Sequence, residues 1–231
     1  MIIAITGTRK GIGRDLANYF LQSGHTVIGC SRQSTELAHP NYEHFCLDVG
    51  EEESVKNLFR EIRARHGQLD VLINNAGVAS MNHFMLTPGA TVRTILQSNL
   101  VGTFICSREA AKLLQKSAAG RIINFSTIAV PLRLAGSAAY AASKSAVVSL
   151  TEIAAKELAP FGITVNAVGP GPVPTSMVRT LPKETIERVI SQQAIKRLGA
   201  MEDIINVVDF LIDPKSSFIT GQTIYLGGIN Q

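Results

Sequence analysis

The feature that most constrains the fold of this chain is its repeated alternation of short apolar runs with amphipathic stretches. The apolar runs occur at residues 2–6, 26–30, 42–47, 69–74, 121–125, 163–168 and 223–226. Most of them are apolar throughout, which is typical of strands buried on both faces of a parallel sheet. The stretches between them predict helices at residues 12–23, 51–66, 91–115 (one long helix or a bent pair) and 140–159. This alternation predicts a doubly wound α/β fold with helices on both faces of the sheet.

The composition fits one compact domain spanning residues 1–231, with 45% hydrophobic and 17% charged residues. The formal net charge of +4 arises without a run of Lys or Arg, which argues against nucleic acid as a partner. No apolar run is long enough to cross a bilayer, so we expect no membrane association. Cys30, Cys46 and Cys106 are odd in number and lie in apolar runs, so we expect reduced core thiols and a cytoplasmic protein. The five histidines show no metal-ligand spacing, so we expect no metal site.

Glycines 7, 11 and 13 lie between the first predicted strand and the first predicted helix. Glycine there allows a tight turn and a close approach of the backbone to a pyrophosphate, which the positive end of the helix attracts. The spacing G-x-x-x-G-x-G departs from the general dinucleotide pattern, and a simple turn is the alternative. The position of the loop favours dinucleotide binding.

Polar residues follow several of the predicted strands, where a doubly wound fold binds its ligands. Asn74 and Asn75 end the run at 69–74, and Ser126 and Thr127 follow the run at 121–125. Tyr140 and Lys144 are four residues apart and therefore share one face of the next helix. A phenol beside an ammonium group predicts a proton donor with a lowered pKa. The alternative is an ordinary helix surface.

The end of the second strand predicts which dinucleotide binds. An NAD site carries a carboxylate there for the ribose 2′-hydroxyl, but this chain has Ser31 and Arg32, with no acid before Glu36. Lys10 and Arg32 place two cations where a 2′-phosphate would lie, and the planar guanidinium suits phosphate oxygens. Two solvated surface cations are the alternative. Together, the cations and the missing acid favour NADPH.

These residues together resemble the short-chain dehydrogenase/reductase family over essentially the whole chain. The matching motifs are Thr6-Gly7-x-x-x-Gly11-x-Gly13, Asp48-Val49, Asn74-Asn75-Ala76-Gly77, Asn99 in Ser-Asn-Leu-Val-Gly, Tyr140-x-x-x-Lys144, Pro170-Gly171, Ile219-Thr220-Gly221-Gln222 and Gly227-Gly228. The resemblance implies a Rossmann fold and an oxidoreductase that uses a nicotinamide cofactor.

The resemblance also implies which residues bind the cofactor. Asp48 would contact the adenine, residues 75–77 would support the adenosine side, and Val173 and Thr175 would cover the nicotinamide. The full implied set is Gly7, Arg9, Lys10, Gly11, Ile12, Gly13, Ser31, Arg32, Asp48, Val49, Asn75, Ala76, Gly77, Tyr140, Lys144, Pro170, Gly171, Val173 and Thr175. The alternatives are a helix cap for Asp48 and simple turns for the others.

The catalytic set implied by the resemblance is Asn99, Thr127, Tyr140 and Lys144. Tyr140 would protonate the carbonyl oxygen as hydride arrives from the nicotinamide. Lys144 would lower the pKa of that phenol, which is about 10 when unperturbed, and would hold the ribose hydroxyls. Asn99 would anchor a water molecule that links Lys144 to solvent.

Thr127 departs from the family pattern, which has a substrate-orienting serine at this position, thirteen residues before the tyrosine. Threonine offers the same hydroxyl donor, although its methyl group crowds the pocket and restricts χ1. We expect Thr127 to do the work of the serine and Ser126 to make a structural hydrogen bond. An impaired site is the alternative.

The chain is most similar to 3-oxoacyl-(acyl-carrier-protein) reductases, which implies reduction of a 3-oxoacyl thioester or related ketone. The implied partners are that small-molecule substrate and the acyl carrier protein, which Arg121 would meet; the missing basic residue at Phe161 weakens the carrier expectation. A lid is expected at about residues 176–195, with an apolar pocket lined by Met177, Val178, Leu181, Ile186, Val189 and Ile190. A homotetramer is expected, or a homodimer. The alternative functions are an NAD(P)-dependent alcohol dehydrogenase of another small substrate and a catalytically impaired NADPH-binding sensor.

Overall fold

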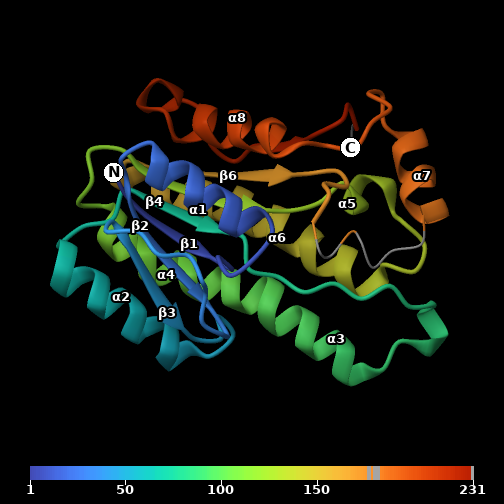
Figure 1. Cartoon of the computed structure of the whole chain (residues 1–231), viewed down its shortest axis with the longest axis horizontal. Coiled ribbons are helices and arrows are strands. Elements are labelled where there is room, and N and C mark those ends of the chain that lie inside the picture. The colour runs from blue at the N-terminus through green and yellow to red at the C-terminus, as the bar shows by residue number, and fades with distance from the viewer. Residues whose placement is uncertain (176–177, 179–182, 230–231) are drawn as a thin grey trace.

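The computed structural model describes residues 1–175, 178 and 183–229, and its centre is a seven-stranded parallel sheet (Figure 1). The strand order is β3-β2-β1-β4-β5-β6-β7, and every neighbouring pair is parallel. The strands are β1 (Ile2–Thr6), β2 (Thr26–Ser31), β3 (Tyr42–Cys46), β4 (Val71–Asn74), β5 (Gly120–Phe125), β6 (Ile163–Gly169) and β7 (Thr223–Tyr225). The predicted doubly wound α/β fold is confirmed. The order reverses direction next to β1, so β1 and β4 flank the switch point where such folds bind ligands.

Helices cover both faces of this sheet. The α-helices are α1 (Ile12–Gln22), α2 (Glu52–His66), α3 (Gly89–Leu96), α4 (Gly102–Leu114), α5 (Ala129–Leu132), α6 (Ala138–Leu158), α7 (Lys183–Gln192) and α8 (Met201–Ile212). One core cluster joins α1 and α8 to the sheet through residues such as Phe20 and Val208. A second joins α2, α4 and α6 to the other face through residues such as Phe59 and Leu113. Each helix therefore buries its apolar stripe against strands that are apolar on both sides.

One of the predicted helices differs from the structure in an informative way. The helix expected at 91–115 is continuous but changes to a π-helical turn at Gln97–Val101, between α3 and α4. In that turn Gly102 N–H donates to Gln97 O, five residues back, which widens the helix. Helix α8 is not among the helices predicted above, although Ile204, Val208 and Leu211 mark its buried face.

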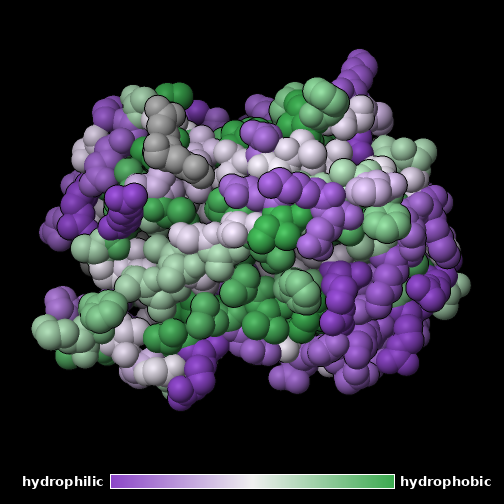
Figure 2. Space-filling model, turned by 180° about the vertical axis from the view of Figure 1, so that it is seen from behind, coloured by the Kyte–Doolittle hydropathy of each residue, from purple (hydrophilic) through white to green (hydrophobic). Residues whose placement is uncertain are grey.

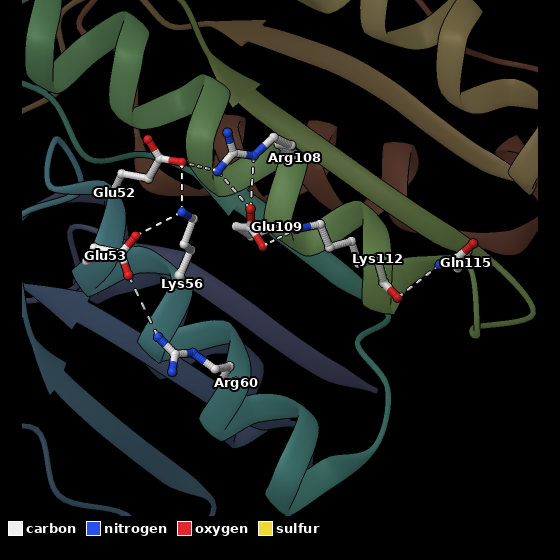
Figure 3. Close-up of polar contacts among 8 residues, drawn as sticks. All are labelled: Glu52, Glu53, Lys56, Arg60, Arg108, Glu109, Lys112 and Gln115. Atoms are coloured by element: carbon white, nitrogen blue, oxygen red, sulfur yellow. Dashed lines mark hydrogen bonds and ion pairs between the residues drawn. The ribbon is translucent and has the colours of Figure 1, made fainter.

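Ion pairs connect α2 to α4 on the second face of the sheet (Figure 3). Arg108 Nη2 of α4 lies 2.8 Å from Glu52 Oε1 of α2, and Lys56 pairs with Glu52 within α2. Glu109, whose side chain is only 8% exposed, accepts hydrogen bonds from Arg108 and Lys112. Burial alone would raise the pKa of Glu109, but these hydrogen bonds outweigh burial and lower it. This buried carboxylate is therefore fully compensated.

A chain of buried polar side chains fixes two strands to two helices beneath the carboxyl edge of the sheet. Asn74 Nδ2 at the end of β4 donates to Ser107 Oγ of α4 and to Asn124 Oδ1 of β5, both at 2.9 Å. Asn124 Nδ2 donates in turn to Thr151 Oγ1 of α6 at 2.9 Å. Buried polar groups joined in this way hold their elements in one arrangement. The network therefore fixes α6 relative to β5.

The cysteine expectation is only partly met. Cys30 and Cys106 are buried core thiols, and burial raises the pKa of Cys30 to about 12. Cys46 is exposed, because it lies on β3 at the edge of the sheet. None of the helices in the described part of the chain is long and apolar enough to cross a membrane.

Candidate active site

Three of the four predicted catalytic residues meet around the carboxyl end of β5. Thr127 follows that strand directly, and Tyr140 and Lys144 lie in the first two turns of α6. Lys144 is 4% exposed, and its Nζ donates to Phe125 O, the last carbonyl of β5, at 2.7 Å. The helix thereby holds a buried ammonium group against the end of the strand.

Asn99, the fourth residue, lies in the π-helical turn and is fully buried. Val78 N–H donates to Asn99 Oδ1 at 2.8 Å, and Asn99 Nδ2 donates to Val78 O and to Ser143 Oγ. A Cβ at Gly77 would lie 3.1 Å from Asn99 Oδ1 and 3.5 Å from Lys144 Nζ. Glycine at position 77 therefore leaves room for the asparagine and the lysine to approach each other.

Ser143 is a residue of this cluster that the sequence reasoning missed. It is fully buried, donates from Oγ to Tyr140 O at 2.7 Å and accepts from Asn99 Nδ2 at 3.0 Å. It links the backbone of the tyrosine to the asparagine. Its spacing of three residues from Tyr140 places it on the same helix face, which was the available signal.

The pKa values of this cluster correct one expectation. Burial lowers the pKa of Lys144 to about 8, because the charged ammonium loses hydration. The pKa of Tyr140 is raised, not lowered: burial raises it, and a hydrogen bond with Thr127 opposes this only in part. Lys144 does not lower the tyrosine pKa in this structure, since its Nζ is directed to Phe125 O. The phenol therefore stays protonated at neutral pH.

Thr127 and Ser126 have separate surroundings. Thr127 Oγ1 accepts from Ala129 N–H at 3.2 Å, and its hydroxyl is the polar group that lowers the pKa of Tyr140 against the effect of burial. Ser126 is 3% exposed, and its Oγ lies 3.5 Å from Lys144 O, directed into the protein. The hydroxyl beside the tyrosine is thus that of Thr127.

The glycine loop is a tight turn closed by Asn75. Gly7 and Gly11 have φ angles of +80° and +62°, which side chains other than glycine rarely adopt. Asn75 Nδ2 donates to the carbonyls of Thr6 and Gly7 at 2.9 and 3.2 Å. A Cβ at Gly13 would lie 2.3 Å from Asn75 Nδ2, so the loop and the asparagine turn fit together only without that side chain.

A cavity of about 800 Å³ opens over this loop and contains most of the predicted cofactor residues. They are Gly7, Arg9, Lys10, Gly11, Ile12, Ser31, Arg32, Asp48, Val49, Asn75, Ala76, Gly77 and Thr175. Pro170, Gly171 and Val173 line a second cavity of about 230 Å³ instead. Gly13, Tyr140 and Lys144 are outside the lining of both cavities. Thr175 lies over the loop, 3.7 Å from a Cβ built at Gly11.

Within the large cavity, the charged residues are unevenly placed. Arg9, Lys10 and Arg32 are exposed cations that line it near the end of β2, whereas Glu36 is outside the lining. Asp48 also lines the cavity, and its Oδ1 accepts from Gly50 N–H at 2.9 Å. Asp48 is not the cap of α2, which begins after Glu51. The arrangement suits an anionic ligand at the β2 end.

One expectation on the substrate side changes with the structure, and a second lies partly outside the described residues. Arg121 is 2% exposed, and its Nη1 donates to Gly120 O at 3.0 Å, so it is not a surface residue that could meet a carrier protein. Of the expected lid, residues 176–177 and 179–182 lie outside the described residues. The rest includes α7, whose Val189 contacts a small apolar cluster with Ile128 and Ile229.

The comparisons with known proteins agree with this geometry. Residues 7–229 match the family model described as enoyl-(acyl carrier protein) reductase. The chain is 36% identical to the 3-oxoacyl-[acyl-carrier-protein] reductase FabG of Staphylococcus aureus, over 97% of this chain and 95% of that protein. The chain belongs to the short-chain dehydrogenase/reductase family. FabG of Salmonella typhimurium is 32% identical over 98% of this chain and 96% of its own length.

Solved structures of this family are equally similar but differ in what they act on. The aldohexose dehydrogenase of Thermoplasma acidophilum superposes with a TM-score of 0.90 at 31% identity, covering 99% of this chain and 93% of that one. A 4-hydroxyisoleucine dehydrogenase complexed with NADH gives 0.88 at 30% identity, covering 99% and 98%. ElxO with NADP bound gives 0.87 at 32% identity, covering 97% and 96%. The chain is thus a short-chain oxidoreductase.

Proposed function

We propose that this protein is an NADPH-dependent ketoreductase that reduces a 3-oxoacyl thioester or related ketone to the 3-hydroxy product. The observation that carries the proposal is the meeting of Tyr140, Thr127 and Lys144 at the end of β5. Two hydroxyl donors side by side suit a carbonyl oxygen, which accepts two hydrogen bonds.

Each residue has a role that follows from its surroundings. Burial raises the pKa of Tyr140, so the phenol keeps its proton until negative charge develops on the substrate oxygen, and then donates it. Thr127 orients that oxygen. Lys144, whose pKa is lowered to about 8, can release and regain a proton near neutral pH and thereby restore the phenol. The bound nicotinamide supplies the hydride.

The residues of the large cavity fit a dinucleotide. The backbone at Gly7, Gly11 and Gly13 carries no side chain that would block a pyrophosphate beside the first turn of α1. Lys10 and Arg32 offer positive charge at the β2 end, and the one carboxylate among the described lining residues is Asp48, which follows β3 and accepts a hydrogen bond from Gly50 N–H. NADPH is therefore preferred to NADH in this proposal, as in the NADP complex of ElxO.

An apolar surface beside the active site supports an acyl substrate. Phe84, Met85 and Leu86 are 75–82% exposed, in the loop that precedes α3. Asn82 N–H donates to Gly136 O at 2.9 Å, which places this loop next to the start of α6. Figure 1 shows the loop and α7 at the same edge of the sheet, where β6 ends. With Arg121 buried, a carrier protein has less support than the acyl thioester itself.

A second function has its own support. The aldohexose and 4-hydroxyisoleucine dehydrogenases have TM-scores of 0.90 and 0.88, at least as high as that of ElxO. An NAD(P)-dependent dehydrogenase of a small polar alcohol would use the same four residues in the opposite direction. A sensor that binds NADPH without turnover is a third alternative, motivated by Thr127.

The test is the loss of 340-nm absorbance with NADPH or NADH and acetoacetyl-CoA, alongside small ketones and aldoses. We expect turnover of acetoacetyl-CoA with NADPH, reduced about 10³-fold or more in Tyr140→Phe. Oxidation of a sugar or hydroxy amino acid with no reduction of acetoacetyl-CoA would favour the second function. Tight NADPH binding without any turnover, also in Thr127→Ser, would favour the sensor.

We also propose that the protein is a cytoplasmic homotetramer. Figure 2 shows apolar side chains gathered in the middle of one face. Phe104 of α4 and Ile153 of α6 are about half exposed, and Phe210 of α8 and Phe218 form a second exposed apolar pair. Two such surfaces suit an assembly with two kinds of interface. Light scattering coupled to size exclusion should give four chains; a monomer would contradict the proposal.

A further inference from the structure

The turn that carries Arg32 is held in place from one side by a histidine. Ser31 Oγ at the end of β2 donates to Gln33 O at 2.7 Å, which closes a short turn with Arg32 at its centre. His44 of β3 reaches both residues: its Nε2 lies 3.1 Å from Ser31 Oγ and 3.1 Å from Gln33 O. One imidazole nitrogen thus contacts the Ser31 side chain and the Gln33 backbone, on either side of Arg32.

The opposite nitrogen of His44 is fixed by a second pair of residues. Nδ1 lies 2.9 Å from the hydroxyl oxygen of Tyr42 and 3.4 Å from Thr8 Oγ1, and Tyr42 also donates to Thr8 at 2.9 Å. A carbonyl can only accept, so Gln33 O requires the proton on Nε2. Because Tyr42 gives its single hydroxyl proton to Thr8, Nδ1 accepts from the Thr8 hydroxyl at 3.4 Å. The hydrogen bonds therefore specify one tautomer and one ring orientation.

This network is built into the sheet. Thr8 is fully buried and belongs to the glycine loop, next to Arg9 and Lys10. A Cβ at Gly29 of β2 would lie 2.3 Å from the Tyr42 hydroxyl and 2.4 Å from Thr8 Oγ1, so the network requires glycine at that position. His44 consequently connects the two segments that carry the cavity's cations.

We propose that His44 is a positioning residue for the 2′-phosphate of NADPH, acting through the Ser31–Gln33 turn. The inference rests on the proposed NADPH preference and deepens it. Arg32 is exposed and long, so much of its phosphate affinity is lost if its backbone is also free to move. Fixing the turn in advance removes that cost, as preorganisation does in other binding sites. Neither His44 nor Tyr42 lines the cavity, so the effect is exerted through the backbone.

Two variants separate the two sides of the imidazole. In His44→Gln, the longer side chain can place an amide N–H where Nε2 donates to Gln33 O, but it loses the contact with Tyr42. In His44→Asn, the shorter side chain can reach Tyr42 but not the turn. Both variants introduce a side-chain amide, and they differ in whether the contact with Gln33 O or the contact with Tyr42 is kept.

The experiment measures affinity and needs no turnover. 2′,5′-ADP carries the 2′-phosphate and 5′-ADP lacks it, so the ratio of their dissociation constants, measured by calorimetry, isolates the phosphate contribution. We expect the wild type to bind 2′,5′-ADP at least about tenfold more tightly. His44→Asn should reduce this ratio about fivefold with little change in 5′-ADP affinity, and His44→Gln should restore most of it.

The other outcomes overturn the inference in distinguishable ways. If the wild type discriminates and both variants retain its ratio, His44 does not position the turn, and the proposed NADPH preference stands. If both variants lose affinity for both nucleotides alike, with a lowered melting temperature, His44 is only structural. A wild-type ratio near one refutes the NADPH preference together with this inference, while the Tyr140→Phe experiment still tests the ketoreductase.

Discussion

The two ends of strand β5 each hold a buried cation, and the comparison between them separates structure from catalysis. At the amino end, Arg121 Nη1 donates to Gly120 O at 3.0 Å; at the carboxyl end, Lys144 Nζ donates to Phe125 O at 2.7 Å. Both side chains are less than 5% exposed. Neither forms an ion pair with a carboxylate among the described residues.

The difference lies in what burial does to each group. Burial lowers the pKa of both, but a guanidinium remains charged at any physiological pH, whereas the Lys144 pKa falls to about 8. Only the lysine can exchange a proton near neutrality. An uncompensated buried charge therefore indicates catalysis only where the group can titrate near neutral pH.

Glu109, in the ion-pair cluster between α2 and α4, is a buried charge that does have partners of opposite charge. It is buried like the two cations, yet Arg108 and Lys112 donate to it and its pKa is lowered, so the charged form is the stable one. Burial of a charge with partners stabilises the fold and leaves no group ready to react.

The largest difference is expected when each of the two buried cations at the ends of β5 is removed in turn. Lys144→Met should reduce the rate of NADPH oxidation about 10³-fold, because the group that returns a proton to Tyr140 is lost. Arg121→Met should stay within about twofold of the wild type and keep or increase the free energy of unfolding, because a buried charge is replaced by an apolar chain of similar length. A comparable loss of activity in Arg121→Met would show that the two ends are not functionally different.

The pH dependence of stability should differ between the same two variants. Lys144 has a folded-state pKa near 8 against 10.5 in the unfolded chain, so its charged form is destabilising below pH 8 and that cost disappears as pH rises to 10.5. The stability advantage of Lys144→Met over the wild type should therefore shrink by about 3 kcal/mol across this range, at 1.36 kcal/mol per pH unit. Denaturant titrations at several pH values measure it, with Arg121→Met as the control. A constant difference would refute the lowered pKa.

Removing the Thr127 hydroxyl next to Tyr140 should lower activity less than removing the Lys144 ammonium group. Thr127→Ala should lower kcat about 10²-fold, because one of two donors to the substrate oxygen is lost. Thr127→Ser should keep kcat within a few-fold and improve turnover of bulky ketones, since it removes only the methyl group. Equal activity in Thr127→Ala and the wild type would mean that this hydroxyl does not touch the substrate.

The smallest effect is expected from a substitution of Glu109 in the ion-pair cluster between α2 and α4. Glu109→Gln should lower the free energy of unfolding by about 1 kcal/mol at pH 7 without changing activity. The lowered pKa of Glu109 means that its contribution is present above the unfolded value of 4.5 and is lost as pH falls through the lower folded value. Urea denaturation at pH 7 and at acidic pH should show that the difference in free energy of unfolding between the wild type and Glu109→Gln is smaller at acidic pH. A loss of activity would connect this cluster to the site.

Much of the fold and the candidate site followed from local sequence. β1 begins and ends where its apolar run does, and the glycine loop, the Asn74–Gly77 turn and Thr127 fall at strand ends as the alternation requires. Such features are local: a strand buried on both faces is mostly apolar, and a helix spacing of four fixes a shared face. Cys46 shows the limit of such local prediction. Its position in an apolar run predicted a buried thiol, but the run does not reveal that β3 is an edge strand of the sheet.

The sequence by itself determined the parallel sheet, the family and the residues brought to its carboxyl edge. Only the tertiary structure decided which polar side chains find hydrogen-bond partners, because partners such as Phe125 O for Lys144 or Ser31 for His44 come from separate elements. The same holds for Arg121, which the sequence placed on the surface and the packing of the α8 end against β5 buries. Periodicity reports which face of an element is apolar; the electrostatic state of a side chain depends on everything packed around it.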